Sequence, residues 1–197
     1  MKQTIIFTLL LLAFTNLEAA ADAVAGKSKS AVCAACHGTD GNSTTSVWPS
    51  LAGQGEHYLA KQMTDFRDGK RKDTAMSPMA IALSDQDIAD LAAYYTSLSA
   101  TTGTTKQQYV ELGSKIYTGG VTGILACAAC HGPNGAGLAA AGFPKVSGQQ
   151  IQYTIKQLNN FKDGSRANGN NTMMIDVAAK MTDEQIEAVA NYLAGLH

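Results

Sequence analysis

The chain has 197 residues, of which 45% are hydrophobic, and its 15 basic and 16 acidic side chains leave a formal net charge of −1. This length fits one or two domains. The near-neutral charge excludes a polyelectrolyte tail and a generic nucleic-acid binder, which would need a marked excess of basic residues, so we expect no nucleic acid among its partners.

The first 19 residues have the pattern of a secretory signal peptide. Lys2 supplies a positive start, and residues 5–14 form an apolar run that is too short to span a bilayer. Small residues follow at positions 19–21, which predicts cleavage between residues 19 and 22. The alternative is an uncleaved anchor, which the short apolar run disfavours. We therefore expect a soluble, exported protein, which in a bacterium lies in the oxidising periplasm.

The remainder of the chain contains two copies of one unit. The sequence Cys-Ala-Ala-Cys-His-Gly at residues 33–38 recurs at residues 127–132. Other blocks repeat in the same order: residues 48–71 match 143–166, and residues 84–98 match 182–196. The matched positions include the pairs Pro49 and Pro144, Gln54 and Gln149, Gln62 and Gln157, and Arg71 and Arg166.

A short segment separates the two copies. Residues 100–105, Ala-Thr-Thr-Gly-Thr-Thr, have no large apolar side chain and no charge, as is typical of a linker. We therefore predict an N-terminal domain at residues 22–99 and a C-terminal domain at residues 106–197.

Both copies carry the signals of helices. Ser84 with Asp87 resembles a capping box, and Thr182 with Gln185 forms a complete one, each ahead of apolar residues at helical spacing. Two further helices are predicted, at residues 56–68 and 151–163, each followed by a glycine in a C-terminal capping position. Because no stretch alternates with a period of two residues, the expected fold class is all-α.

All four cysteines lie in two Cys-x-x-Cys-His motifs, a spacing that indicates covalent attachment of haem c. On one helical turn the two sulfurs lie on the same face, where they can reach the two vinyl groups of one haem. We therefore predict two haem c groups, one on Cys33 and Cys36 and the other on Cys127 and Cys130. The histidine that ends each motif is placed to bind the iron; these residues are His37 and His131.

Three other uses of the motif compete with haem attachment. A thioredoxin-like dithiol needs a βαβ context, which the sequence lacks, and it does not need the histidine. A zinc site would require cysteine and histidine ligands pooled from two domains. A pair of plain disulfides is the third alternative. Each copy also has roughly 80 to 90 residues, a length at which an apolar core is marginal, so that a buried porphyrin would add hydrophobic mass.

The repeat suggests a second ligand for each iron. Electron-transfer haems of low spin usually pair histidine with methionine, which raises the potential. Among seven methionines, only Met76 and Met174 occupy equivalent positions, eight residues before Ser84 and Thr182. We predict these two as axial ligands, with Met79 and Met173 as their nearest rivals.

Pro49 and Pro144 are candidate orienting residues. A metal-bound imidazole usually donates its other N–H to a fixed acceptor. The proline carbonyls could accept this bond from His37 and His131, although prolines also simply shape turns.

The chain resembles the dihaem cytochromes c of the cytochrome c4 family over essentially all of its predicted mature length. The resemblance depends on the two motifs together with three other stretches, which are Phe143-Pro144-Lys145 with Gly148-Gln149, Lys156-Gln157-Leu158, and Ala190-Asn191-Tyr192-Leu193. It implies two tandem class I cytochrome c domains, related by pseudo-twofold symmetry, with their haems close together across the interface.

The resemblance also implies site residues and partners. It pairs His37 with Met76 and His131 with Met174 as axial ligands, and it gives Pro49 and Pro144 the histidine-orienting positions. It implies electron delivery to a respiratory terminal oxidase from a quinol-oxidising complex or another donor, and it allows a peripheral association with the membrane.

The predicted function is that of an electron carrier, with no catalytic residue. Two alternatives remain at this point. One is a dihaem peroxidase or a small oxidoreductase, which would need an open or releasable iron position. The other is a subunit fixed in a larger dehydrogenase complex. The sequence leaves open both midpoint potentials and the direction of transfer between haems.

Overall fold

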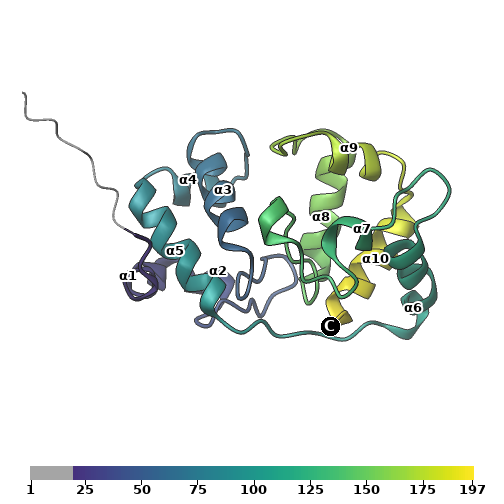
Figure 1. Cartoon of the computed structure of the whole chain (residues 1–197), viewed down its shortest axis with the longest axis horizontal. Coiled ribbons are helices and arrows are strands. Elements are labelled where there is room, and N and C mark those ends of the chain that lie inside the picture. The colour runs from purple at the N-terminus through teal and green to yellow at the C-terminus, as the bar shows by residue number, and fades with distance from the viewer. Residues whose placement is uncertain (1–19) are drawn as a thin grey trace, which may run out of the picture.

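A computed structural model describes residues 20–197, so the predicted signal peptide at residues 1–19 lies outside the described residues. The described chain is helical, with two isolated β-bridges and no strand (Figure 1). The first half contains α1 (Ala23–Lys29), a 3-10 turn (Ser30–Val32), α2 (Ala34–His37), α3 (Glu56–Arg67), α4 (Met76–Ala80) and α5 (Asp85–Ser97). The second half contains α6 (Gln107–Ser114), a π turn (Lys115–Gly119), α7 (Ala128–His131), a 3-10 turn (Ala139–Ala141), α8 (Ile151–Lys162), α9 (Met173–Ala178) and α10 (Asp183–Gly195).

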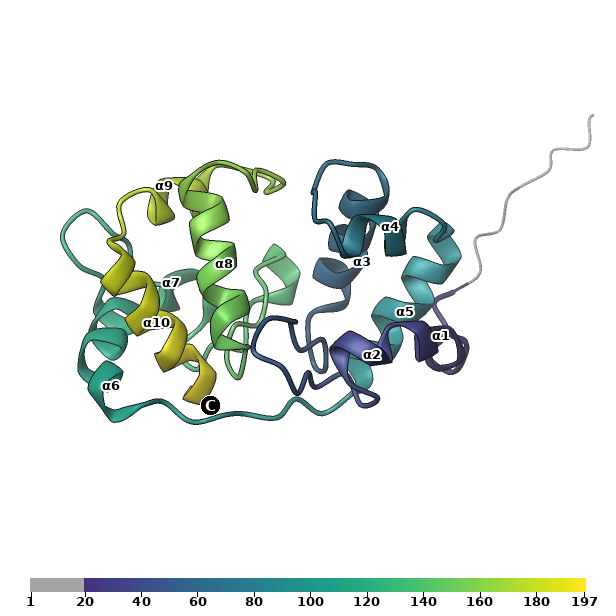
Figure 2. The same ribbon diagram turned by 180° about the vertical axis from the view of Figure 1, so that it is seen from behind.

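The two halves lie side by side, and each has its own hydrophobic core (Figures 1 and 2). In the first half α5 packs against α1 and α3, and in the second α10 packs against α6 and α8. The first core contains Leu59, Leu91, Ala92, Tyr94 and Tyr95. The second contains Ile116, Tyr117, Ile124, Met181, Ile186, Val189 and Leu193. Two separate cores, joined by a helix-free segment at residues 99–106, fit the repeat seen in the sequence.

The helix signals of the sequence are confirmed. Both capping boxes form, with the Ser84 and Thr182 side chains accepting from the third backbone N–H of α5 and α10. The helices predicted at residues 56–68 and 151–163 are α3 and α8, and each ends one residue earlier than expected. The glycines that follow, Gly69 and Gly164, adopt φ values of 74° and 77°, in the left-handed region that favours glycine.

One glycine in each half lets two helices cross closely. A Cβ atom on Gly26 would lie 2.0 Å from the Asp90 carbonyl oxygen, at the crossing of α1 and α5. A Cβ atom on Gly113 would lie 2.5 Å from the Cβ of Tyr192, where α6 crosses α10. Since such distances are too short for real atoms, only glycine fits at either crossing.

The halves differ most in the segment that precedes the second motif. After α6 the chain forms a π turn, and Val121 and Ile124 then pair in a short antiparallel bridge. The segment has no counterpart in the first half, where α1 and a 3-10 turn run directly into α2. It buries Ile124 in the second core and leaves Leu125 60% exposed. Among residues 20–197, no helix combines the length and the apolar character that crossing a bilayer requires.

Candidate functional site

Each Cys-x-x-Cys-His motif folds as a single helical turn. The His37 N–H donates to the Cys33 carbonyl oxygen at 3.0 Å, and the His131 N–H donates to that of Cys127 at 2.9 Å. The turn ends at Gly38 and Gly132, whose φ values of 82° and 79° stop the helix directly after the histidine. Because one turn spans the motif, the two cysteines of each pair lie on one face.

The four cysteines are half-buried, and no disulfide joins any of them. Burial raises the pKa of the Cys33 thiol, and it raises the pKa of Cys127 to about 11. Such thiols are protonated at neutral pH, unlike the activated thiolate of a redox dithiol. Within residues 20–197, no three histidine, cysteine, aspartate or glutamate side chains gather as they would to hold a metal ion. The described structure thus offers no cluster for the zinc alternative.

A proline carbonyl fixes each motif histidine. His37 is 4% exposed, and its Nδ1 lies 2.8 Å from the Pro49 carbonyl oxygen. In the second half, His131 Nδ1 lies 2.9 Å from the Pro144 carbonyl oxygen. Burial lowers the pKa of both imidazoles, so both rings are neutral at neutral pH. Since a carbonyl can only accept, Nδ1 donates its proton and Nε2 keeps the lone pair that a metal needs.

The candidate methionines begin two short helices. Met76 is the first residue of α4, and Met174 is the second residue of α9. Both are half-buried, whereas their rivals Met79 and Met173 are 49% and 39% exposed.

A single cavity of about 530 Å³ brings these groups together. From the first half, Cys33, His37, Met76 and Met79 line it, and from the second half Cys127, Cys130, His131, Met173 and Met174. Cys36 and the two glycines that end the motifs are not among the lining residues. The wall is largely apolar and includes Leu51, Leu59, Phe66, Leu158 and Phe161. The cavity is thus continuous from one motif to the other.

Two buried arginines border the same cavity. Arg71 and Arg166 are each 7% exposed, and each guanidinium stacks 4.5 Å from the ring centre of a phenylalanine, Phe66 and Phe161 respectively. Neither guanidinium takes part in a salt bridge with any residue of 20–197.

Only neutral oxygens accept from these guanidiniums, and the bonds to glutamine and tyrosine follow the same pattern from both sides. Arg71 donates to Gln62 of its own half at 2.8 Å, and to Gln157 and Tyr153 of the other half at 2.7 and 3.2 Å. Arg166 donates to Gln157 at 2.8 Å, and to Gln62 and Tyr58 of the other half at 3.2 and 3.0 Å. Exchanging each residue for its repeat partner reproduces these bonds, as a pseudo-twofold axis between the halves requires. One further bond, from Arg166 Nε to Asn168 Oδ1 at 3.2 Å, has no counterpart at Arg71.

The cavity suits the cofactor that the motifs predict. Haem is a flat, mostly apolar ring that carries two carboxylates. The apolar wall matches the rings, and each half supplies one guanidinium that can compensate a carboxylate, because a buried charge is normally compensated by an opposite one. The Tyr95 hydroxyl, which also borders the cavity, is buried with no hydrogen-bond partner among the described residues.

Sequence reasoning missed the arginines and the glutamines as site residues. The available signal was their repetition, since Gln62 and Arg71 recur as Gln157 and Arg166. Polar residues that recur at matching positions of a duplicated unit can mark its interface.

Comparison with known proteins agrees with this architecture. The family model described as cytochrome c matches the chain twice, at residues 23–99 and 110–197. A cytochrome c4 from Azotobacter vinelandii is 47% identical, with the alignment covering 100% of both chains.

The chain belongs to the cytochrome c4 family.

A solved structure supports the assignment. The crystal structure of reduced recombinant cytochrome c4 from Pseudomonas stutzeri is 45% identical and has a TM-score of 0.88, covering 90% of this chain and 100% of the other. A more distant relative is the thiosulfate dehydrogenase electron acceptor of Stutzerimonas stutzeri, which is 37% identical over 83% of this chain and 78% of its own length.

Membership of the cytochrome c4 family confirms the predicted fold class and cofactors. The protein has two tandem cytochrome c domains, and it carries two covalently bound haem c groups, one on Cys33 and Cys36 and one on Cys127 and Cys130. It is a dihaem electron-transfer protein.

Proposed function

We propose that the protein is a periplasmic carrier that takes electrons from a quinol-oxidising complex or another donor and delivers them to a respiratory terminal oxidase. The main support is that both motifs, with a half-buried methionine from each half, line one continuous cavity. Such an arrangement suits storage and exchange of electrons, and an axial methionine at each iron would leave no position free for a substrate. Export is supported by the signal-peptide pattern of residues 1–19.

The proposed axial ligands are His37 with Met76 and His131 with Met174. Each histidine lines the cavity with its Nδ1 already committed to a proline carbonyl. Burial favours Met76 over Met79 and Met174 over Met173, because an axial sulfur has to be withdrawn from solvent. The thioether raises the potential, which suits a carrier that delivers electrons to an oxidase.

The haem iron supplies the one-electron chemistry when bound, and the chain determines how that chemistry is used. Pro49 and Pro144 hold the two imidazoles in one tautomer and one orientation. Phe66, Phe161 and the leucines of the wall exclude water, which sets the local dielectric. Arg71 and Arg166 place two positive charges where the two halves meet.

A second candidate is an electron-accepting subunit of a dehydrogenase complex. It is favoured by the relative named as a thiosulfate dehydrogenase electron acceptor. In that case the protein would still carry electrons, but its donor would be an enzyme that oxidises a small inorganic or organic substrate.

Rapid mixing of the purified, reduced holoprotein with bacterial membranes tests the first candidate. We expect oxidation by oxygen that depends on the membranes and stops when cyanide blocks the terminal oxidase. Peroxide-dependent oxidation without membranes would instead support an enzyme and contradict the proposal. Failure with membranes, combined with rapid reduction by a soluble dehydrogenase, would favour the second candidate.

A further inference from the structure

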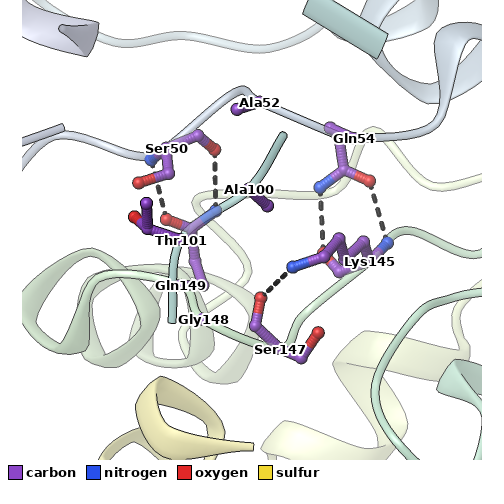
Figure 3. Close-up of a pocket in the computed structure, with 9 residues that line it drawn as sticks. All are labelled: Ser50, Ala52, Gln54, Ala100, Thr101, Lys145, Ser147, Gly148 and Gln149. Carbon is purple, nitrogen blue, oxygen red and sulfur yellow. Dashed lines mark hydrogen bonds between the residues drawn. The ribbon is translucent and has the colours of Figure 1, made fainter. Parts of the chain in front are cut away.

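Two glutamines connect the halves through an unusual pair of contacts (Figure 3). The Gln149 carboxamide accepts from the Ser50 backbone N–H at 2.9 Å and donates to the Ser50 carbonyl oxygen at 3.0 Å. The Gln54 carboxamide accepts from the Lys145 N–H at 2.8 Å and donates to the Lys145 carbonyl oxygen at 2.9 Å. Each side chain thus binds the backbone of one residue in the opposite half.

The contacted residues directly follow the two orienting prolines. The carbonyl of Pro49 and the N–H of Ser50 belong to one peptide group. That group accepts from His37 Nδ1 at 2.8 Å through its oxygen, and it donates to Gln149 through its nitrogen. The peptide between Pro144 and Lys145 does the same, with His131 at 2.9 Å on one side and Gln54 on the other.

Such a chain of hydrogen bonds is cooperative. When a peptide N–H donates, electron density moves toward the carbonyl oxygen, which then becomes a stronger acceptor, by roughly 10–30% per bond. A stronger acceptor draws the Nδ1 proton further from the imidazole ring. The ring then becomes a better donor at Nε2, which stabilises the oxidised state of a bound metal.

We propose that Gln149 and Gln54 are positioning residues that tune the histidine of the opposite domain, Gln149 acting on His37 and Gln54 on His131. Docking of the domains thereby sets the potential of each site from across the interface. The inference rests on the proposed role of the two histidines as axial ligands. A purely adhesive role would not require both contacts to fall on the residue that follows an orienting proline.

The test uses NMR spectra of the reduced holoprotein, together with redox titration. In Gln149→Leu the peptide loses its acceptor, so the Nδ1–H resonance of His37 moves upfield while that of His131 stays in place. The midpoint potential of the N-terminal site rises. In Gln54→Leu the pattern is reversed, with the shift at His131 and the rise at the C-terminal site.

A second variant distinguishes the proposed tuning from a general loosening of the interface. Gln149→Glu loses the donor to the Ser50 carbonyl oxygen, but it keeps an acceptor for the Ser50 N–H and adds a negative charge, which strengthens that bond. The His37 Nδ1–H resonance should therefore move downfield, opposite to its movement in Gln149→Leu. A loosened interface would move the resonance in the same direction in both variants and would overturn the proposal.

The neighbouring residue supplies a matched control. Gln150 donates through Nε2 to the Ser43 carbonyl oxygen of the other half at 2.6 Å, without touching either proline peptide. Gln150→Leu should leave both imidazole resonances unchanged. Equal shifts in this control, or a Gln149→Leu effect at His131 instead of His37, would overturn the proposal.

The same spectra separate this inference from the proposed ligation. Ring protons of an axial histidine are displaced strongly by the ring current of haem. If the His37 protons show no such displacement, the ligand assignment fails. If the His37 ring protons are displaced but the Nδ1–H resonance does not move in Gln149→Leu, the ligand assignment stands and only the cross-domain tuning fails.

Discussion

A single backbone contact prepares each motif histidine for its proposed role. An exposed imidazole exchanges between two tautomers and is half protonated near pH 6.5. His37 and His131 are instead neutral, since burial lowers the pKa of both rings, and the proline carbonyls hold their protons on Nδ1. The residues that matter at this scale therefore include two prolines, which act through their backbone carbonyls.

The axial methionine can be tested by a pair of substitutions in the first domain. Met76→Ala should remove about half of the methionine-to-iron charge-transfer absorption and lower one midpoint potential, because one of two sulfur ligands is lost. Absorption spectra and a redox titration measure both effects. Met79→Ala, which alters a side chain that is 49% exposed, should leave the absorption band intact. The opposite outcome would transfer the ligand role to Met79.

The buried guanidiniums predict an electrostatic effect on the potential. Arg166→Gln removes a positive charge beside the cavity. Loss of this charge stabilises the oxidised haem, which is more positive than the reduced haem, so the midpoint potential should fall. Redox titration at two salt concentrations measures the shift, which should persist because burial limits screening. Lys106→Gln, an exposed charge change of the same sign, should have little effect at the higher salt concentration. Equal effects of both substitutions would contradict a local role for Arg166.

Sequence and structure agree unequally at the residue scale. The spacing of the cysteine motifs alone predicts haem attachment. The repeat identified Met76, Met174 and both prolines as candidates. The roles of Arg71 and Arg166 could not be predicted, because the partners that they bind across the interface lie 82 to 108 positions away in the chain. The repeat identified these residues as equivalent, but it did not predict their hydrogen-bond partners.

At the scale of elements, the two halves are built by the same helix crossings. Gly26 and Gly113 hold α1 against α5 and α6 against α10 at a distance that no side chain permits. These crossings support the segments that run on to the cysteine motifs, so they help to place the motifs against their cavity.

Gly26→Ala tests the close crossing. The new Cβ would lie 2.0 Å from the Asp90 carbonyl oxygen, so the helices must separate. We expect a loss of about 1–3 kcal/mol in the free energy of unfolding, typical of an overpacked core. Denaturant unfolding of the holoprotein measures it. Gly119→Ala, where a Cβ would meet nothing within 4 Å, provides the control and should change stability far less. Equal stability of the two variants would contradict the packing argument.

The predictable elements are those with local signals. Capping boxes placed the starts of α5 and α10, and terminal glycines placed the ends of α3 and α8 to within about one residue, because these signals involve neighbours in the chain. The π turn Lys115–Gly119 and the bridge between Val121 and Ile124 were not predicted. This segment has no counterpart in the first copy, and its conformation depends on burying Ile124 in the second core.

At the scale of the whole molecule, two small cores meet at a polar interface. The interface consists largely of side-chain amides, guanidiniums and backbone groups, arranged about a pseudo-twofold axis. Its reciprocal pattern follows from the repeat in the sequence, since equivalent residues from the two copies face each other. The order of the domains was predictable from the repeat, whereas the contacts between them were not.

Loss of one attachment site tests how far each domain depends on its haem. In the variant that combines Cys33→Ser with Cys36→Ser, we expect one covalent haem by pyridine haemochrome assay. The N-terminal domain should lose its cooperative unfolding transition, because an apolar core of this size is marginal without the buried ring. The corresponding changes at Cys127 and Cys130 should act on the other domain. A variant that keeps two cooperative transitions would contradict the argument from size.

A spectroelectrochemical titration of the purified holoprotein tests the central claim most directly, namely that each domain closes one covalent haem between a histidine and a methionine. The account predicts two low-spin haems per chain, two one-electron steps at positive potential, and methionine-to-iron absorption in the oxidised state. A high-spin haem that binds peroxide, or a single redox step from one haem per chain, would contradict it.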